Sequence, residues 1–223
     1  MPFLNTIISK LLNIVFPVTC VACGKNGAYV CLSCISEFPP AERESAKWIF
    51  PVFDYRHPPV KKALWLLKYK NKKKLAETFA EVLYGKLLEE LSELSIMENF
   101  RSPILIPIPL SKKRYKERGY NQAELIAKEL IKINNLRHGV DLGLETGVLI
   151  KPKDTEHQAR IRNRSERLKN IIGSFAVKNP EVIDKKNIIL IDDILTTGAT
   201  LTEARRVLRK AGARKVVAFT VAH

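Results

Sequence analysis

The sequence predicts an α/β fold in which a parallel sheet is flanked by helices, with a small module ahead of it at the N-terminus. Short apolar runs alternate with amphipathic stretches, which is the order of strands and helices that builds a parallel sheet. The apolar run at 188–191 is followed by a turn, a helix and a second apolar run, so that 187–221 forms a βαβ unit. All four cysteines lie close together near the N-terminus. We therefore expect an N-terminal module at 1–45 and a main α/β domain at 46–223.

The elements follow one another without a low-complexity linker. Residues 3–16 carry apolar side chains at helical spacing and predict an amphipathic helix, while no apolar run reaches the roughly 18 residues that a membrane span requires. In chain order we expect a cysteine module at 18–36, a strand near Pro51–Tyr55, helices at 59–70 and 72–94, a strand at 104–108, a basic loop, a helix at 120–133, a hood-like segment at 136–175 that begins with a loop at 136–146, and the βαβ unit.

The turn of the βαβ unit carries the clearest chemical signal. Asp192 and Asp193 follow the apolar residues where the strand should end, and the small-residue turn Thr196–Ala199 opens the next helix. Thr200 and Glu203 have the spacing of a capping box, and Gly212 should end the helix. A glycine-containing turn that enters a helix directs backbone N–H groups at one point, where the helix dipole adds partial positive charge. This arrangement suits a phosphate.

The two carboxylates need a different task, because they would repel a phosphate bound beside them. They can accept hydrogen bonds from the vicinal hydroxyls of a sugar, or they can help to hold a divalent cation near phosphate groups. A phosphate at the helix and ribose hydroxyls at the carboxylates together describe a ribose 5-phosphate ligand. The alternative is an ordinary βα turn with two solvated acids, which would not require the acidic pair and the Thr-Thr-Gly-Ala-Thr run together.

Cys20, Cys23, Cys31 and Cys34 are the chain's only cysteines, and they have the spacing Cys-x2-Cys-x7-Cys-x2-Cys. Two such turns can place four thiolates tetrahedrally around one Zn²⁺. Two disulfides are the competing interpretation. We favour zinc, because the sequence has no credible signal peptide and the rest of it has a cytosolic character. Four protein ligands would make the site structural and closed, as in a zinc ribbon.

The run 188–200 resembles the phosphoribosyl pyrophosphate (PRPP) fingerprint of the type I phosphoribosyltransferases. The resemblance implies that Asp192 and Asp193 contact the ribose hydroxyls and are the candidate catalytic residues. It also implies that the turn wraps the 5-phosphate and that Mg²⁺ accompanies the pyrophosphate. Hood elements are implied within 56–100 and 136–175. The turn residues concerned are Thr196, Thr197, Gly198, Ala199 and Thr200.

A four-cysteine module ahead of such a domain resembles the ComF family, which includes competence proteins of DNA uptake. Further segments carry the resemblance: Ile106–Leu110, Lys112–Gln122 with its Arg-Gly-Tyr-Asn-Gln end, Gln158, and Arg167–Phe175. Tyr120 stands where the family usually has phenylalanine, and Lys151-Pro152 stand where arginine-led sequence is expected. The family implies a cytoplasmic protein that works with DNA-uptake machinery. The amphipathic helix leaves a peripheral place at the inner face of the membrane open.

The formal net charge is +15, and the charge is clustered. Residues 61–74 hold seven lysines and no acid, and 101–120 hold six basic residues against one acid. A pyrophosphate-bearing ligand needs only a few cations, so this surplus favours a polyanionic partner such as nucleic acid. A solvated lysine-rich surface is the alternative.

One helix gives that partner a candidate surface. In the helix at 59–70, apolar residues share one face and the opposite side is aromatic and basic. Lysines flanking two aromatic rings suit base stacking with phosphate neutralisation, the recognition mode of single-stranded nucleic acid. The alternative is that the rings pack beneath a neighbouring element. The residues of this candidate nucleic-acid face are Lys61, Lys62, Trp65, Lys68 and Tyr69.

The basic loop after the strand at 104–108 lies where the phosphoribosyltransferases bind pyrophosphate and keep a mobile flap. Arg114 and Arg118 are the candidate pyrophosphate contacts, since arginine can grip phosphate with two hydrogen bonds. Gly119 would give the loop its bend, and Asn121-Gln122 would open the next helix. A plain surface loop is the alternative.

Two functional hypotheses follow. In the first, the chain is a ComF-like protein that has a PRPP-type site and binds single-stranded DNA during DNA uptake. In the second, it is an active phosphoribosyltransferase that joins a base or an amine to PRPP and releases pyrophosphate. The sequence does not identify the nucleophile, so whether the chain is an enzyme stays open.

Overall fold

The computed structural model describes residues 18–42, 46–152 and 171–223. The amphipathic helix expected at 3–16 lies outside these residues. Gln158 and the first part of the run 167–175 lie outside them as well.

The expected α/β fold is confirmed. Among the described residues, five strands form one sheet in the order β1–β7–β6–β2–β3, and every neighbouring pair runs parallel. Strands of this kind are covered on both faces, which explains their almost continuous apolar sequences. The strands are β1 (Ile49–Phe53), β2 (Ile104–Pro107), β3 (Gly143–Leu144), β6 (Asn187–Ile194) and β7 (Lys215–Ala222).

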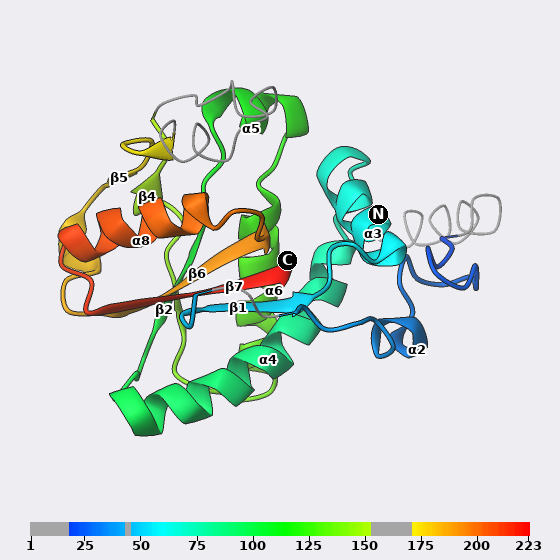
Figure 1. Ribbon diagram of the computed structural model, residues 1–223, viewed down its shortest axis with the longest axis horizontal. Coiled ribbons are helices and arrows are strands. Elements are labelled where there is room, and N and C mark those ends of the chain that lie inside the picture. Colours follow the sequence, from blue (N-terminus) through cyan, green and yellow to red (C-terminus); the bar gives the residue numbers. More distant parts are fainter. Residues whose placement is uncertain (1–17, 43–45, 153–170) are drawn as a thin grey trace, which may run out of the picture.

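Side chains of successive strand residues point to opposite faces, and β6 divides accordingly between two hydrophobic clusters. Ile189 and Ile191 join the cluster that includes α3 (Pro58–Tyr69), α4 (Leu75–Glu98) and α6 (Gln122–Leu136). Ile188 and Leu190 join the cluster of α8 (Ala199–Lys210). Figure 1 shows α4 and α8 on opposite sides of the sheet. The α8 side also receives a two-stranded antiparallel sheet of β4 (Leu149–Ile150) and β5 (Ala176–Val177).

Element boundaries differ from the expected ones where tertiary pairing decides. The first strand begins at Ile49, before the expected Pro51, because it pairs with β7 from its first residue. The expected loop at 136–146 contains β3, which exists by pairing with β2. A 3-10 turn, η2 (Pro180–Val182), precedes β6.

The segment expected as a basic loop is the helix α5 (Lys112–Arg118). The Ser111 hydroxyl accepts a hydrogen bond from the Arg114 N–H, which caps the first turn. Gly119 has φ 75° and ends the helix in the left-handed region, so the bend expected at this glycine is present as a helix C-cap.

The cysteine module packs directly against the main domain. It contains the short helix α2 (Leu32–Ile35), and its Val30, Ile35 and Phe38 are buried in the same cluster as residues of β1 and α3. The Phe38 ring meets the Phe53 ring edge-on, with 5.6 Å between their centroids. In the described part of the chain, no helix is both long and apolar enough to cross a membrane.

Candidate functional site

The carboxyl ends of the parallel strands meet at one edge of the sheet, and a cavity of about 360 Å³ opens there. Open α/β sheets bind their ligands at this edge. The cavity brings together residues that are far apart in the chain. Its described lining consists of Tyr55, Lys68, Ile108, Pro109, Leu110, Ser111, Arg114, Arg118, Gln122, Lys151, Ile171, Asp192, Asp193, Ile194, Thr196, Thr197, Ala199 and Thr200.

The fingerprint residues lie where β6 meets α8. The strand continues to Ile194, so Asp192 and Asp193 belong to its last residues and do not follow it as expected. Asp193 is buried, whereas Asp192 is half-buried. Thr196, Thr197, Ala199 and Thr200 line the cavity. Gly198 does not line it, but its φ of 74° makes the turn into α8.

The capping box expected at Thr200 and Glu203 is wrong. The N-cap of α8 is Gly198, which makes no side-chain capping bond, and Thr200 lies within the helix. The Glu203 carboxylate instead accepts a hydrogen bond of 2.7 Å from the Gly173 N–H and pairs with Arg206 at 2.7 Å. Arg206 and that hydrogen bond together hold the pKa of Glu203 below its ordinary value. Glu203 therefore fastens the segment at 171–175 to α8.

Lys68 is placed differently from the rest of the candidate nucleic-acid face. Its Nζ lies 2.8 Å from Asp193 Oδ2, and the two side chains are only 16% and 5% exposed. Residue 68 lies at the margin of the apolar stripe of α3. Because α3 packs at the sheet edge, this margin faces the cavity. The ion pair supplies the counter-charge that a buried carboxylate requires.

The two adjacent carboxyl groups do not ionise alike. Desolvation, followed by the charge of Asp193, raises the pKa of Asp192 to about 8. Asp192 therefore holds its proton to a higher pH than an ordinary carboxyl group does, while Asp193 is the carboxyl group that contacts Lys68. Two close carboxyl groups with one cation commonly divide in this way.

The α5 arginines stand at the border of the cavity. Arg114 and Arg118 both line it, and Gly119 does not. The Arg118 guanidinium donates to Gln122 Oε1 at 2.9 Å and to the Tyr69 hydroxyl at 3.4 Å, and it lies 5.0 Å from the centroid of the Tyr69 ring. The expected flap arginine is thus joined to the aromatic side of α3.

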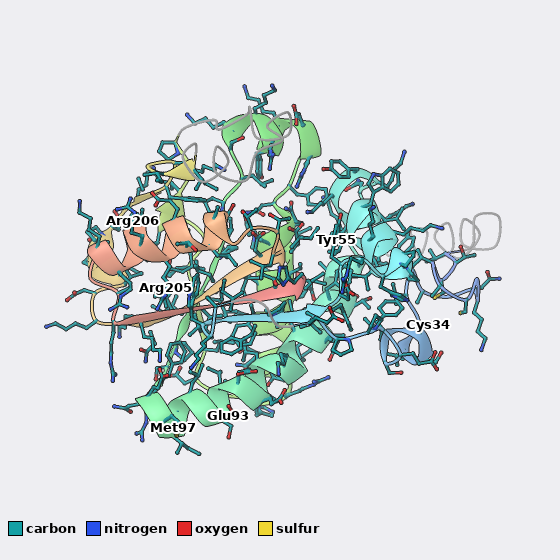
Figure 2. The ribbon with its side chains drawn as sticks, in the orientation of Figure 1. Cys34, Tyr55, Glu93, Met97, Arg205 and Arg206 are labelled. Atoms are coloured by element: carbon teal, nitrogen blue, oxygen red, sulfur yellow. The ribbon has the colours of Figure 1, made fainter. Side chains whose placement is uncertain are left out.

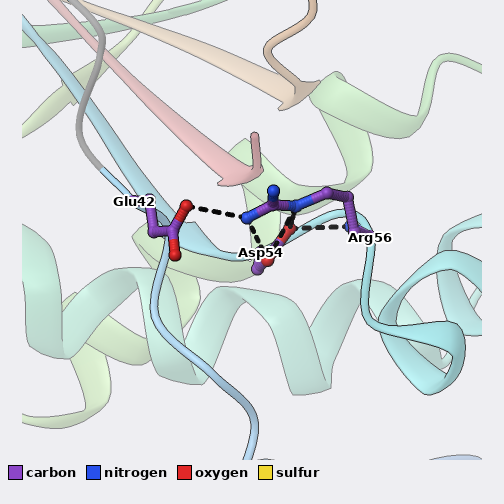
Figure 3. A network of polar contacts seen from close by, with 3 residues as sticks. All are labelled: Glu42, Asp54 and Arg56. Atoms are coloured by element: carbon purple, nitrogen blue, oxygen red, sulfur yellow. Dashed lines mark hydrogen bonds and ion pairs between the residues drawn. The ribbon is translucent and has the colours of Figure 1, made fainter.

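The loop after β1 brings Tyr55 to the cavity. Next to it, Arg56 pairs with Asp54 at 2.9 Å and with Glu42 at 2.8 Å, as Figure 3 shows. Arg56 also donates its backbone N–H to Asp54, and its side chain lowers the pKa of that carboxyl. This network fixes the loop that carries Tyr55.

Four polar residues of the cavity were not among the predicted site residues: Tyr55, Ser111, Gln122 and Lys151. Lys151 follows β4, and its ammonium lies 5.3 Å from the centroid of the Phe175 ring. Lys151-Pro152 departs from the arginine-led sequence of the ComF pattern, and this departure argued against a role for the strand end. Gln122 belongs to the Arg-Gly-Tyr-Asn-Gln segment of the ComF resemblance. Tyr55 and Ser111 had no local signal, because only tertiary packing brings them to the cavity.

The outer side of α3 remains accessible. Lys61 and Lys62 are exposed, and the Trp65 and Tyr69 residues are 46% and 59% exposed. Their rings lie 6.3 Å apart between centroids, and Lys70 lies 5.2 Å from the centroid of the Trp65 ring. The two rings therefore stand open beside lysines, in contrast to the alternative in which they pack beneath a neighbouring element.

The four cysteines form a compact cluster at the other end of α3. Their sulfur atoms all lie within 4.8 Å of one another, and Cys23 Sγ is 3.7 Å from Cys31 Sγ. All four are free thiols, and 3.7 Å is far from a disulfide bond of about 2.05 Å. A tetrahedron with zinc–sulfur bonds of about 2.3 Å has sulfur–sulfur edges of about 3.8 Å. The cluster therefore fits a Zn²⁺ ion better than disulfides.

The thiol pKa values agree with a cation site. A hydrogen bond with the Ser33 hydroxyl lowers the pKa of Cys31 to about 6, whereas hydrogen bonds with Cys31 and Cys23 raise the pKa of Cys34 to about 12. Cys31 therefore forms a thiolate readily, whereas the neighbouring cysteines oppose the deprotonation of Cys34. A divalent cation removes that opposition. Figure 2 shows Cys34 and Arg206 toward opposite ends of the long axis, with Tyr55 between them.

Comparison with known proteins identifies the domain that carries this site. The model of the family "Phosphoribosyl transferase domain" matches residues 116–223, which include the fingerprint and Arg118. Competence protein F of Haemophilus influenzae is 27% identical over 211 residues, covering 91% of this chain and 83% of that protein. The chain carries a phosphoribosyl transferase domain and is a ComF homologue.

Two further relatives are similar to the chain. DNA utilization protein YhgH of Escherichia coli O6:H1 is 26% identical, covering 88% of this chain and 80% of YhgH. Competence protein ComFC of Streptococcus pneumoniae is 34% identical, over 56% of this chain and 50% of ComFC. The cysteine module, α3 and Arg114 lie outside the residues that the domain model matches.

Among solved structures, hypoxanthine-guanine phosphoribosyltransferase from Schistosoma mansoni aligns with 13% identity and a TM-score of 0.37. The alignment covers 66% of this chain and 55% of that one.

Proposed function

We propose that this ComF homologue binds PRPP with Mg²⁺ in the cavity at the sheet edge, binds single-stranded DNA on the outer side of α3, and acts in DNA uptake. The observation that supports this most is the meeting of the fingerprint turn, both carboxyl groups and the α5 arginines in one cavity. The relatives named for competence and DNA utilization support the DNA part. Such a role belongs in the cytoplasm, at the inner face of the membrane.

The cavity can divide the ligand among its residues. The N-terminus of the twelve-residue α8, with Thr196, Thr197 and Thr200, suits the 5-phosphate. Asp192 and Asp193 suit the ribose hydroxyls, with the protonated Asp192 able to donate as well as accept. Arg114 and Arg118 suit the pyrophosphate.

The DNA surface is proposed on Lys61, Lys62, Trp65 and Tyr69. Rings stack on bases of any sequence, and lysines neutralise the backbone, so binding should be strong in low salt and weakly dependent on sequence. Lys68 belongs to the cavity and is left out of this surface. In the cysteine module, a Zn²⁺ held by Cys20, Cys23, Cys31 and Cys34 would supply structure, with no open position for chemistry.

The first experiment measures both ligands on the zinc-loaded protein. We expect Mg²⁺–PRPP to bind in calorimetry and Asp193→Asn to weaken it at least tenfold, since a charged hydrogen-bonding group contributes about 1.5–3 kcal/mol. Labelled (dT) oligonucleotide should bind with a steep salt dependence, and Trp65→Ala should weaken it about tenfold or more, because stacking contributes about 1–3 kcal/mol per base.

Matched variants make the outcome specific. Lys62→Ala should weaken DNA binding, whereas Lys132→Ala, an exposed lysine of α6, should not. An equal loss of DNA affinity in both variants would mean that DNA is attracted to basic residues in general and not to this surface. If Asp193→Asn binds PRPP as tightly as the original protein does, PRPP does not bind in this cavity.

A second candidate function is phosphoribosyl transfer. The basic helix α5 at the cavity border favours it, because its arginines can stabilise a departing pyrophosphate. The C1–oxygen bond to pyrophosphate would break as a nucleophile bonds to C1. A screen of bases and amines for pyrophosphate release tests it. Release that is unchanged in Asp192→Asn and Asp193→Asn would exclude this cavity as its source.

A further inference from the structure

A second cavity adjoins the first. It has a volume of about 680 Å³ and is lined by Lys68, Tyr69, Asn71, Lys73, Arg114, Glu117, Arg118, Gly119 and Tyr120. Lys68, Arg114 and Arg118 belong to both cavities. A ligand in the second cavity would therefore lie beside one bound in the first.

The second cavity is strongly cationic. Four of its lining side chains are basic, and Glu117 is the one acid among its described residues. Lys68 is already paired with Asp193, whereas Lys73 and the two arginines, which also line the cavity, have no such ion pair with any residue that the structure describes. Lys73 is exposed, with its ammonium 4.8 Å from the centroid of the Tyr120 ring. This composition favours an anion, and for arginine a phosphate in particular.

The lining also offers groups that suit a base. Tyr69 is 59% exposed, and the Arg118 guanidinium lies against its ring, so that the pair presents a flat surface. Asn71 adds an amide, which can donate and accept hydrogen bonds, and has φ 54°. The volume is within the range of small-ligand sites, about 300–1,000 Å³. A phosphate, a flat ring and an amide-paired edge together describe a nucleotide.

The second cavity is continuous with the outer side of α3. Tyr69 lines the cavity, and its ring lies 6.3 Å from that of Trp65, on the proposed DNA surface. A strand that stacks on Trp65 would thus have the second cavity as its next position.

We propose that the second cavity binds a nucleoside 5′-phosphate unit, from a free nucleotide or from the end of a single strand, beside the ribose phosphate of the first cavity. The proposal rests on the proposed function for its neighbour in the first cavity. The base packs against Tyr69 and Arg118, and Lys73 and Arg114 hold the phosphate.

The test titrates thymidine 5′-monophosphate into protein saturated with Mg²⁺–PRPP, in a calorimeter. We expect one nucleotide to bind per chain with PRPP still in place. Lys73→Ala should weaken nucleotide binding about tenfold, the effect of losing a charged hydrogen bond, and should leave PRPP affinity unchanged. Lys74→Ala, an exposed neighbour outside both linings, is the matched control.

Deoxyribose 5-phosphate, which lacks the base, should bind more weakly than the nucleotide, and Tyr69→Ala should remove that difference. Whether the nucleotide is free or is the end of a single strand is tested by comparing the affinities of (dT) oligonucleotides with and without a 5′-phosphate. A gain from the phosphate that Lys73→Ala abolishes identifies the end of a strand, and the absence of a gain identifies a free nucleotide.

Loss of nucleotide binding when PRPP saturates the protein would place the nucleotide in the first cavity and overturn the proposal. Equal affinities in Lys73→Ala and Lys74→Ala would overturn it too. If PRPP does not bind but the nucleotide still binds in a Lys73-dependent way, the proposed function fails and the second cavity stands.

Discussion

Asp192 and Asp193 are neighbours in the chain, yet the end of β6 sends their side chains into different surroundings. Asp193 is buried against Lys68, and Asp192 is half-buried beside that pair. Desolvation and the neighbouring charge of Asp193 raise the pKa of Asp192, so the proton of this pair is placed on Asp192. The site thus contains both a charged acceptor and a neutral donor.

This proton has a consequence for stability. The folded Asp192 keeps its proton up to a pKa of about 8, whereas the unfolded chain releases it near the ordinary 3.8. Between these values the folded state binds more protons, so raising the pH favours unfolding. The contribution of Asp192 is thus fully present below about pH 4 and lost as the pH rises through about 8.

We expect Asp192→Asn to remove this dependence. Urea unfolding at several pH values should show the variant gaining stability relative to the original protein as the pH rises. Parallel stability curves for the two proteins would contradict the assigned proton.

Single elements position the site through their ends. Asn121 caps α6 by accepting from the Ala123 N–H at 3.0 Å, and its amide donates to the Ile108 carbonyl at 2.9 Å. One side chain therefore starts the helix and fixes the loop after β2, from which the cavity takes its Ile108–Ser111 wall. The Tyr120 hydroxyl donates to the Leu67 carbonyl and ties the same turn to α3.

We expect Asn121→Ala to cost about 2 kcal/mol of stability, combining a lost N-cap with a buried carbonyl left without its donor. Affinity for PRPP should fall as well, because the loop that carries Ser111 loses its tether. Urea unfolding and calorimetry measure the two effects. Asn135→Ala, an exposed position of the same helix, should change neither; equal effects in both variants would argue against the tether.

At the scale of the whole molecule, the cysteine module and the sheet share one core. Val30, Ile35 and Phe38 are buried with Phe53 and Val60, and α3 runs from this contact to Lys68 in the cavity. We propose that 1–45 and 46–223 differ in function but do not fold as separate units. Because they share one core, we expect them to unfold together.

Removal of the metal tests this coupling. Cys34→Ser should lose the Zn²⁺, seen in metal analysis, and should lower the unfolding free energy by about 3 kcal/mol or more, since structural zinc contributes directly to folding. Because the core is shared, tryptophan fluorescence and circular dichroism should report one common transition at a lower urea concentration. Ser36→Ala is the nearby control. Separate transitions would mean that the module folds independently.

The sequence by itself determined what depends on local order. Hydrophobic periodicity predicted the parallel α/β fold, and the spacing of the cysteines predicted their cluster. The fingerprint run predicted a strand, a turn and a helix in that order, because all three form within one segment. The strand end was expected before Asp192, whereas β6 continues to Ile194. The exposed side of α3 was predictable for the same reason, as helical geometry alone separates Trp65 from the apolar stripe.

Only the tertiary structure decided what depends on which distant elements meet. Lys68 stands at the margin of its helix, and its pairing with Asp193 required α3 to lie against the end of β6. Glu203 looked like half of a capping box, but a partner thirty residues away, the Gly173 N–H, is its actual contact. The sequence singled out residues of α3 and of α5 separately, but only packing brings these two helices together to form the second cavity. Local periodicity fixes the direction of a side chain on its own element, and only packing decides what stands opposite.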